Sequence, residues 1–218
     1  MTIMWYGHAC FKIETREATL AIDPFSKNIG IAAPRFQADV ILMSHEHPAH
    51  ANAESIGGTP RVITGPGEYE VKGVAITGIP SFHDAAKGQE RGLNTIWRIT
   101  ADGMTIAHLG DFGEKDLRAE TLEALGAVDI LLIPVGGAPH TIAGETAAAI
   151  ANRIEPKIVI PMHYAIPGLS VDIASPDAFL KAFGASAPER LPKFAIRSKE
   201  LPAEEETRLV LLAAGGER

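Results

Sequence analysis

The sequence is poor in cysteine, in aromatic residues and in long apolar runs. Its single cysteine, Cys10, excludes an intramolecular disulfide, and the alternating pattern of residues 10–14 favours a buried structural thiol over a reactive one. No apolar run approaches the ~20 residues that a membrane-spanning helix requires. The first residues have neither a basic start nor a long apolar core, so we expect no signal peptide. We therefore predict a cytoplasmic protein that does not bind a membrane.

Positive charge is also scarce. The chain has 20 Lys and Arg residues against 27 Asp and Glu residues, which gives a formal net charge of −7. No window of the sequence supplies a basic face, and this argues against nucleic acid and anionic membrane surfaces as partners. We expect a small-molecule substrate instead, and leave open whether the protein forms a homo-oligomer.

The composition that remains is typical of a globular protein. Hydrophobic residues make up 46% of the 218 residues, and the 21 glycines and 15 prolines are scattered as turn signals. The sequence contains no linker, residue-level repeat or low-complexity tract. We predict one domain over residues 1–218, with two tightly joined β-rich halves as the alternative.

Short alternating or β-branched segments dominate the first half of the chain and predict strands. They are residues 3–6, 9–15, 18–24, 38–44, 60–64 and 69–79, followed by a hairpin of residues 92–100 and 104–110. Helical and strand patterns alternate after that point. The helical segments are residues 114–125, 143–154 and 175–183, and the strands are residues 128–135, 157–164, 193–197 and 207–212. This order predicts an α/β layered arrangement, with helices outside two packed sheets.

Three histidines stand close together directly after the strand predicted for residues 38–44. His45 and His47 are two positions apart in extended chain, so their side chains point to the same side. His50 follows Pro48 at the start of a predicted helix and would face the same pocket from another direction. Because neutral imidazoles are preferred zinc ligands, the segment predicts a metal site.

Three further candidate ligands stand where predicted strands end, namely His83, Asp111 and His163. Strand ends that converge at one sheet edge hold side chains on a rigid scaffold beside free loops. A lone histidine at such a place is more often capped or solvated. Five histidines and one aspartate together indicate a metal centre.

These residues resemble a known family. The segment SHEHPAH, residues 44–50, is similar to the HxHxDH signature of the metallo-β-lactamase superfamily, and His83, Asp111 and His163 match its later ligands in order. The resemblance runs from GHACF to IPMHY, and looks closest to the small zinc-dependent hydrolase-like branch related to ascorbate-6-phosphate lactonase. It implies a four-layer αββα sandwich of two mixed β-sheets, with helices on the outer faces and metals at the edge between the sheets.

The resemblance implies two metal positions that share Asp111. The first would be held by His45, His47 and His83, and the second by His50 and His163. The family pattern has an aspartate ligand of the second metal where this chain has Ala49. Losing that carboxylate removes a donor and a negative charge, so the second position should bind metal more weakly or stay empty. Glu46 is a poor replacement, because alternation points it away from its two neighbouring histidines.

The chemistry expected of such a centre is hydrolysis. A bound dication lowers the pKa of its water from 15.7 to ~7 and polarises a carbonyl or phosphoryl oxygen. We predict a metal-dependent hydrolase that holds one or two Zn²⁺ ions per chain, with Mn²⁺ or iron as alternatives. Asp111 and His8 are the candidate catalytic residues. The alternative is a metal-binding protein whose catalysis is weakened or lost because of Ala49.

Weaker signals surround these residues. His8 stands in a turn predicted between two strands, where it is either a proton donor or substrate contact, or a surface residue. Asp23 and Asp84 either orient a ligand histidine through its second ring nitrogen or simply form turns. His108 is expected to be packed within its strand. His140 is expected on a surface loop, with substrate contact as the alternative.

Overall fold

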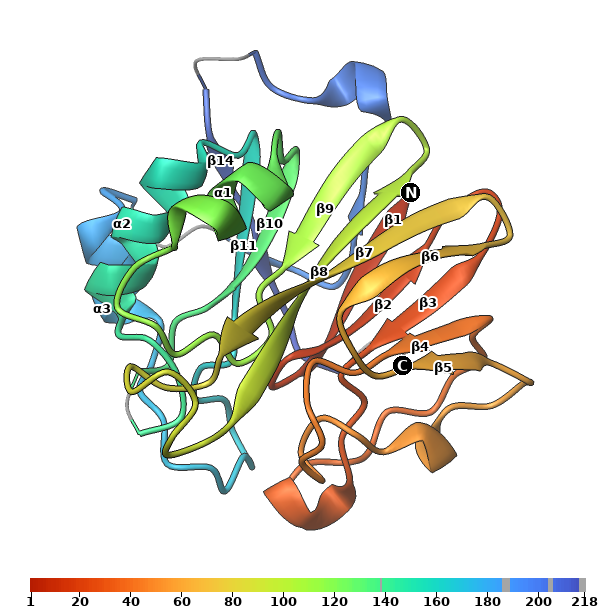
Figure 1. The fold of residues 1–218 in the computed structure, drawn as a ribbon, viewed down its shortest axis with the longest axis horizontal. Helices are drawn as coiled ribbons and strands as arrows, with labels where there is room; N and C mark the ends of the chain where they lie inside the picture. Colours follow the sequence, from red (N-terminus) through yellow and green to blue (C-terminus); the bar gives the residue numbers. More distant parts are fainter. Residues whose placement is uncertain (138, 186–188, 204–205, 216–218) are drawn as a thin grey trace.

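The computed structural model describes residues 1–137, 139–185, 189–203 and 206–215, and its main feature is two mixed β-sheets that face each other (Figure 1). The six-stranded sheet has the order β13-β1-β2-β3-β4-β5. Its strands are β1 Thr2–Gly7, β2 Cys10–Glu14, β3 Thr19–Ile22, β4 Val40–Leu42, β5 Arg61–Ile63 and β13 Phe194–Ala195. β1, β2 and β3 pair antiparallel, whereas β3, β4 and β5 pair parallel.

The second sheet has seven strands in the order β14-β11-β10-β9-β8-β7-β6. They are β6 Gly67–Val71, β7 Val74–Phe82, β8 Leu93–Ala101, β9 Met104–His108, β10 Ile130–Pro134, β11 Ile158–Met162 and β14 Arg208–Leu209. The hairpins from β6 to β9 are antiparallel, and β9, β10, β11 and β14 pair parallel. A separate short pair joins β12 Arg190–Leu191 to β15 Leu211–Leu212. The predicted strands are confirmed with two corrections. The single strand expected over residues 69–79 is a hairpin, in which β6 and β7 pair antiparallel around a turn at Lys72 and Gly73. The strand expected over residues 207–212 is divided into β14 and β15, which belong to different sheets.

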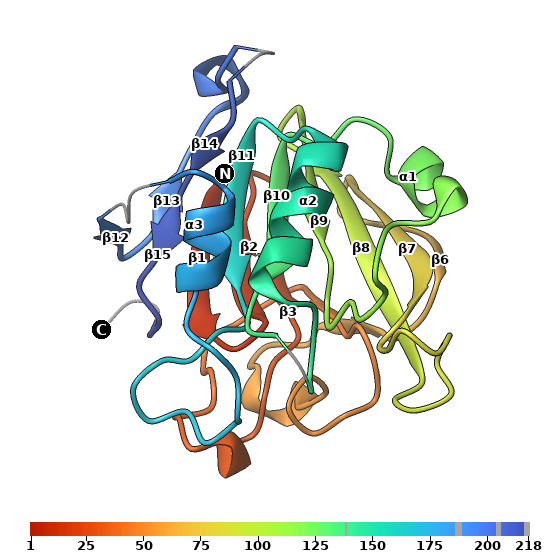
Figure 2. The same ribbon diagram turned by 90° about the vertical axis from the view of Figure 1, so that its left-hand side faces the viewer.

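Three α-helices cover the outer face of the seven-stranded sheet (Figure 2). They are α1 Ala119–Leu125, which lies against β7, α2 Gly144–Ile154, which lies against β10, and α3 Asp177–Ala182, which packs on α2. α2 buries a stripe of small and branched side chains toward the sheet, including Ala147, Ala151 and Ile154. In the described part of the chain, no helix is long and apolar enough to cross a membrane.

The outer face of the six-stranded sheet is covered differently. In the described residues, the helices on this side are two single 3₁₀ turns, η1 Lys27–Ile29 and η2 Ala53–Ser55. η2 replaces the longer helix that we expected after Pro48. Two consecutive glycines follow it, and Gly58 has a φ of 92°, a left-handed conformation that stops helical continuation. The two mixed sheets of the predicted fold are confirmed, with loops rather than α-helices as the layer on this face.

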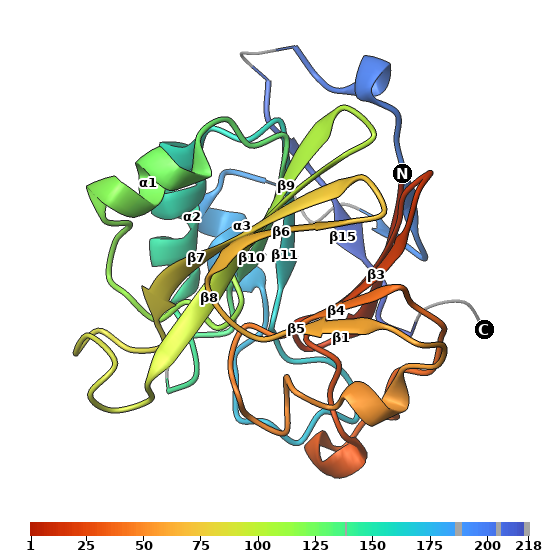
Figure 3. The same cartoon turned by 45° about the vertical axis from the view of Figure 1, so that its right-hand side comes forward.

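The core lies between the two sheets. Alternate residues of β1 and β2, such as Trp5 and Phe11, meet residues such as Trp97 and Ile106 of the second sheet in one buried cluster. The connections that follow β3, β4, β7 and β11 gather along one edge of this sandwich (Figure 3). At that edge the ends of packed strands provide a rigid base, and the connecting loops extend beyond it.

Candidate metal centre

Polar side chains from six separate segments meet at this edge. They are His8 between β1 and β2, Asp23 after β3, the histidines of residues 45–50 after β4, His83 after β7, Asp111 after β9 and His163 after β11. A cavity of about 320 Å³ lies among them, lined by His8, His45, His47, His50, His83, Asp111 and His163. The structure therefore brings every residue of the predicted metal centre to one place.

Asp111 lies at the centre of the group and is only 3% exposed. Its Oδ2 is 3.0 Å from Nε2 of His50 and 3.4 Å from Nε2 of His83. Its Oδ1 is 3.1 Å from Nε2 of His163, a contact that is not aligned as a hydrogen bond. Burial would raise the pKa of Asp111, but the charges of His163 and His50 outweigh burial and hold this pKa well below its usual value. Asp111 is thus a buried carboxylate shared by three imidazoles.

Gly110 allows Asp111 to take this place. Its φ is 60°, and a Cβ atom there would lie 2.4 Å from Oδ1 of Asn94 and 2.6 Å from Cβ of Ser44. The same Oδ1 accepts the backbone N–H of Asp111 at 3.0 Å. Any side chain at position 110 would therefore break the contact that fixes the Asp111 backbone.

Asp23 is buried next to the cavity and fixes the ring orientation of two histidines, His50 directly and His45 through Ser44. Its Oδ2 contacts Nδ1 of His50 at 3.0 Å and accepts the hydroxyl of Ser44 at 2.7 Å, while its Oδ1 accepts the Ser44 N–H. Because the Ser44 hydroxyl donates to Asp23, the 3.0 Å contact between Ser44 Oγ and His45 requires His45 Nδ1 to donate. Both histidines are then held through Nδ1, which leaves Nε2 for the cavity. Of the two roles considered for Asp23, the structure supports orientation.

Two neighbouring carboxylates favour the protonated form of His50. Burial alone would lower the pKa of His50, but the charges and hydrogen bonds of Asp111 and Asp23 outweigh burial and raise the pKa to about 10. Burial, followed by the charge of His50, lowers the pKa of His45 to about 3. Burial and the charges of His163 and His50 also hold the pKa of His8 well below its usual value. A metal ion on Nε2 of His50 would replace the proton that this nitrogen otherwise donates to Asp111, while Nδ1 keeps its contact with Asp23.

Several ring nitrogens at the centre have no hydrogen-bond partner in the described part of the chain. Nδ1 of His8, of His83 and of His163 are buried and unpaired among the described residues. Buried polar atoms of this kind require an explanation, and an ion is one. Two groups of three residues each have ligand atoms that all lie within 4.8 Å of one another. One group is His8, His50 and His163, and the other is His45, His50 and Asp111. The donor set, rich in neutral imidazole with a carboxylate, fits a divalent transition metal.

Comparison with known proteins identifies the family. A model of the β-lactamase superfamily domain matches residues 2–163. A solved structure from Thermotoga maritima, described as a candidate Zn-dependent hydrolase of the metallo-β-lactamase superfamily, is 34% identical and superposes with a TM-score of 0.79 over 97% of both chains. The chain belongs to the metallo-β-lactamase superfamily.

Sequence relatives agree with this assignment to the superfamily. A protein of Pyrococcus abyssi named UPF0173 metal-dependent hydrolase is 32% identical over 215 residues, which cover 85% of this chain and 93% of that protein. A protein of the same name from Thermococcus onnurineus is 31% identical over 214 residues, with the same coverage of 85% and 93%.

Two positions of the segment 44–50 do not offer a buried ligand atom to the centre. His47 is exposed, its ring stacks on His45 with centroids 6.1 Å apart, and its Nδ1 faces the N–H of Ala49 at 3.3 Å. Ala49 lines the cavity but is only 5% exposed, and it packs with Cys10, Phe25 and Ile29. At the position where the family resemblance predicts an aspartate, the chain therefore has a methyl group packed in an apolar cluster.

The remaining candidates lie around the centre without joining it. His108 is buried, its Nε2 donates to the carbonyl of Ala9 at 2.9 Å and its Nδ1 accepts the N–H of Gly110, so it is packed as expected. Burial raises the pKa of the Cys10 thiol well above its usual value, which agrees with a structural role. Asp84 accepts four backbone N–H groups of the loop 86–91, and so it shapes that loop rather than orienting His83.

Two further residues, Ser44 and Arg91, contribute to the site without a signal in the sequence. Ser44 directly precedes His45 and joins it to Asp23, a link that position alone does not reveal. Arg91 is at the end of the loop shaped by Asp84 and lines the cavity. Its Nη1 is 3.3 Å from Nδ1 of His140. His140 thus lies on a loop, as expected, and this loop is at the rim of the cavity.

Replacing Asp23 with asparagine should lower the metal affinity of the centre by about 10- to 100-fold, the usual effect of losing a carboxylate behind a ligand histidine. The amide side chain would keep the shape but lose the charge that fixes His50 and Ser44. Competition with a chromophoric chelator measures the affinity. Asp39→Asn is the matched control, because Asp39 pairs with Lys72 away from the cavity. An Asp23→Asn affinity equal to that of the control would contradict the role of Asp23.

Proposed function

We propose that this protein is a metal-dependent hydrolase that uses metal-activated water on an ester, lactone or phosphoester bond of a small molecule. The observation that carries the proposal is the buried carboxylate of Asp111, surrounded by imidazoles at one cavity. Several ring nitrogens of these imidazoles have no hydrogen-bond partner in the part of the chain that the structure describes. The relatives named metal-dependent hydrolases support the same reaction class.

The proposed ligands are His45, His47, His50, His83, Asp111 and His163. Zn²⁺ is the preferred ion because the donor set is mainly imidazole, and Mn²⁺ or iron are alternatives. Such an ion lowers the pKa of a bound water to ~7 and polarises the substrate oxygen. Asp111, whose pKa is held low, stays ionised and would orient the attacking water by accepting a hydrogen bond from it.

The volume of the cavity and the arginine at its rim favour a small, negatively charged substrate. Its volume of about 320 Å³ is within the range of small-molecule sites. Among the described residues that line it, Arg91 supplies the only guanidinium or ammonium group, positioned at the rim beside His140. An arginine there suits a phosphate or carboxylate of the substrate. The resemblance to ascorbate-6-phosphate lactonase makes a phosphorylated sugar lactone a natural first compound to test.

Arg91→Gln should raise KM for an anionic substrate by about tenfold or more and change kcat much less, because the lost contact binds ground state and transition state alike. The measurement is steady-state kinetics on paired substrates with and without the anionic group. Lys87→Gln is the control, since Lys87 is on the same loop but lines a different surface hollow. Equal KM effects on both members of the substrate pair would contradict the assignment.

The test of the function is a substrate panel with the zinc-loaded protein. The panel contains carboxylic esters, lactones, phosphomonoesters and phosphodiesters, each followed for hydrolysis with and without a chelator. We expect turnover of at least one class that stops on chelation. Metal binding without turnover of any class would favour the second candidate, a metal-binding protein with lost catalysis, for which Ala49 is the specific observation. Cytoplasmic location, oligomeric state and the absence of a nucleic-acid partner stay predictions from composition.

A further inference from the structure

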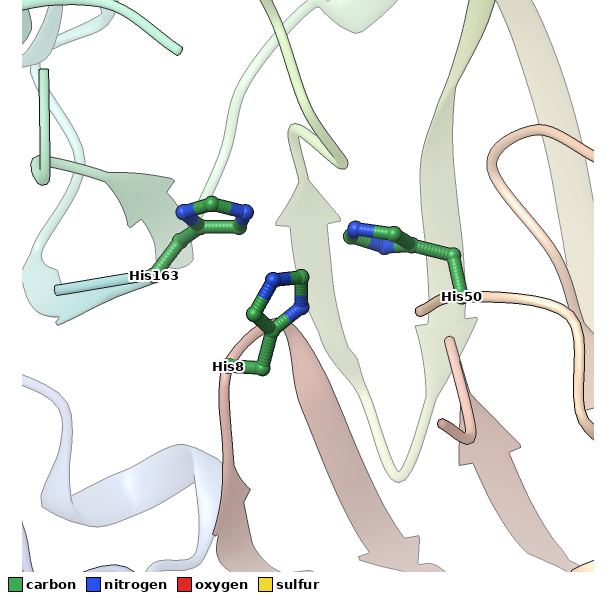
Figure 4. A group of neighbouring side chains, drawn as sticks. All are labelled: His8, His50 and His163. Carbon is green, nitrogen blue, oxygen red and sulfur yellow. The ribbon is translucent and has the colours of Figure 1, made fainter. Parts of the chain in front are cut away.

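His8, a candidate catalytic residue, is buried at the cavity and is not the surface residue that was its alternative. It comes from the turn between β1 and β2, far from the motif of residues 45–50, yet its ring centroid is 4.5 Å from that of His50 and 4.0 Å from that of His163. Figure 4 shows the three rings around a common space. One ring nitrogen from each lies within 4.8 Å of the other two. His8 therefore stands beside the two histidines that the missing carboxylate would have joined.

The backbone holds His8 in this place. Its carbonyl oxygen accepts the indole N–H of Trp5 at 2.9 Å and the backbone N–H of His163 at 2.9 Å. His8 has a φ of 54° and His163 a φ of 52°, both in the left-handed region that a non-glycine residue adopts at some cost. Two strained residues tied directly to each other fix the relative position of their rings.

The surroundings of His8 are those expected of a metal ligand. The residue is 2% exposed, and its Nδ1 is buried without a partner among the described residues. The ring packs edge-on against Phe25, which also packs with Ala49. Ala49 and His8 thus both pack on Phe25 and both line the cavity.

We propose that His8 replaces the missing carboxylate of position 49, so that His8, His50 and His163, together with Asp111, form a second metal site in this chain. This inference rests on the proposed metal centre. It adds that three of the four ligands at the second metal position are histidines. Exchange of a carboxylate for a neutral imidazole lowers the negative charge of the site by one, which favours Zn²⁺ over harder ions such as Mn²⁺. The site keeps its donor number despite Ala49.

A proton donor at position 8 is the competing role. The positioning of His8 against His163 and its unpaired buried nitrogen fit either role, so the test must measure metal and not only turnover. The variant of choice is His8→Asn, because asparagine tolerates the left-handed conformation of this turn and its side chain is shorter. Ala49→Asp and the double variant complete the set, and His140→Ala is the control for removing a histidine from the same cavity.

The readouts are zinc per chain after dialysis at fixed free Zn²⁺, and the dissociation constant of each equivalent by chelator competition. We expect two equivalents in the wild type and in His140→Ala. His8→Asn should weaken the second equivalent by at least about 100-fold with the first unchanged. Adding Ala49→Asp to His8→Asn should restore the second equivalent, because the carboxylate returns. Circular dichroism checks that each variant is folded.

Different results separate this inference from the proposed function. No zinc bound by the wild type would overturn both. One equivalent in the wild type, or two that His8→Asn leaves unchanged, would overturn the role of His8 alone. A crystal of the zinc-loaded wild type needs no substitution: an anomalous peak about 2.1 Å from a ring nitrogen of His8 is expected. A structure with both ions and no such peak would refute the assignment.

Discussion

Asp111→Asn should abolish hydrolysis, with kcat/KM reduced by about 1,000-fold or more, which corresponds to about 4 kcal/mol of transition-state stabilisation. The substitution keeps the size of the side chain but removes the charge that three histidines share. One oxygen of the carboxylate becomes an amide nitrogen, which cannot bind a cation. We expect the zinc content per chain to fall together with activity, because the proposed shared ligand of both positions is lost.

The metal content decides what the loss of activity means. Asp129→Asn is the matched control, since Asp129 pairs with Lys157 and the Thr105 backbone outside the cavity and should keep both zinc and activity. If Asp111→Asn kept its full zinc content and its activity, Asp111 would not be a ligand and the proposed centre would be wrong. The pKa of His50 should also drop in this variant, because Asp111 is one of the two carboxylates that raise it.

The sequence predicts the location of the centre better than its details. Candidate ligands such as His83 and His163 could be found because each follows a recognisable strand, and parallel strands end at the same sheet edge. The sequence leaves two roles open for Asp23, because an aspartate that forms a turn and an aspartate that orients a ligand histidine can have the same neighbours in sequence. Only the tertiary structure shows that Asp23 lies beneath His50.

Other features could not be derived because they depend on contacts distant in sequence. The position of His8 is fixed by the backbone N–H of His163, 155 residues later, and a local reading of a turn contains no trace of that bond. The helix expected after Pro48 is replaced by the single turn η2. The apolar residues of this segment pack as a loop on the sheet, in a cluster with Ile56 and Ile41. Propensity was overruled there by the two glycines that follow and by packing on the sheet.

Metal removal should lower the melting temperature of the loaded protein by about 8–16 °C. A ligand present at 1,000 times its dissociation constant stabilises the folded state by about 4 kcal/mol. For a chain of this size, each kcal/mol corresponds to about 2–4 °C. The physical reason is the charge balance of the centre: without an ion, the buried carboxylates of Asp23 and Asp111 rely on protonated His50, and buried nitrogens such as Nδ1 of His8 stay unpaired.

Differential scanning fluorimetry of zinc-loaded and chelator-treated protein measures this shift, and re-addition of Zn²⁺ should reverse it. Asp111→Asn provides the internal comparison, because a protein that cannot hold the ion should melt at the same temperature with and without chelator. A wild type that loses its zinc yet melts unchanged would show that the ion binds equally well to the unfolded chain, for example through its eight histidines. The cavity would then be a poor binding site, and the proposed metal centre would lose its main physical support.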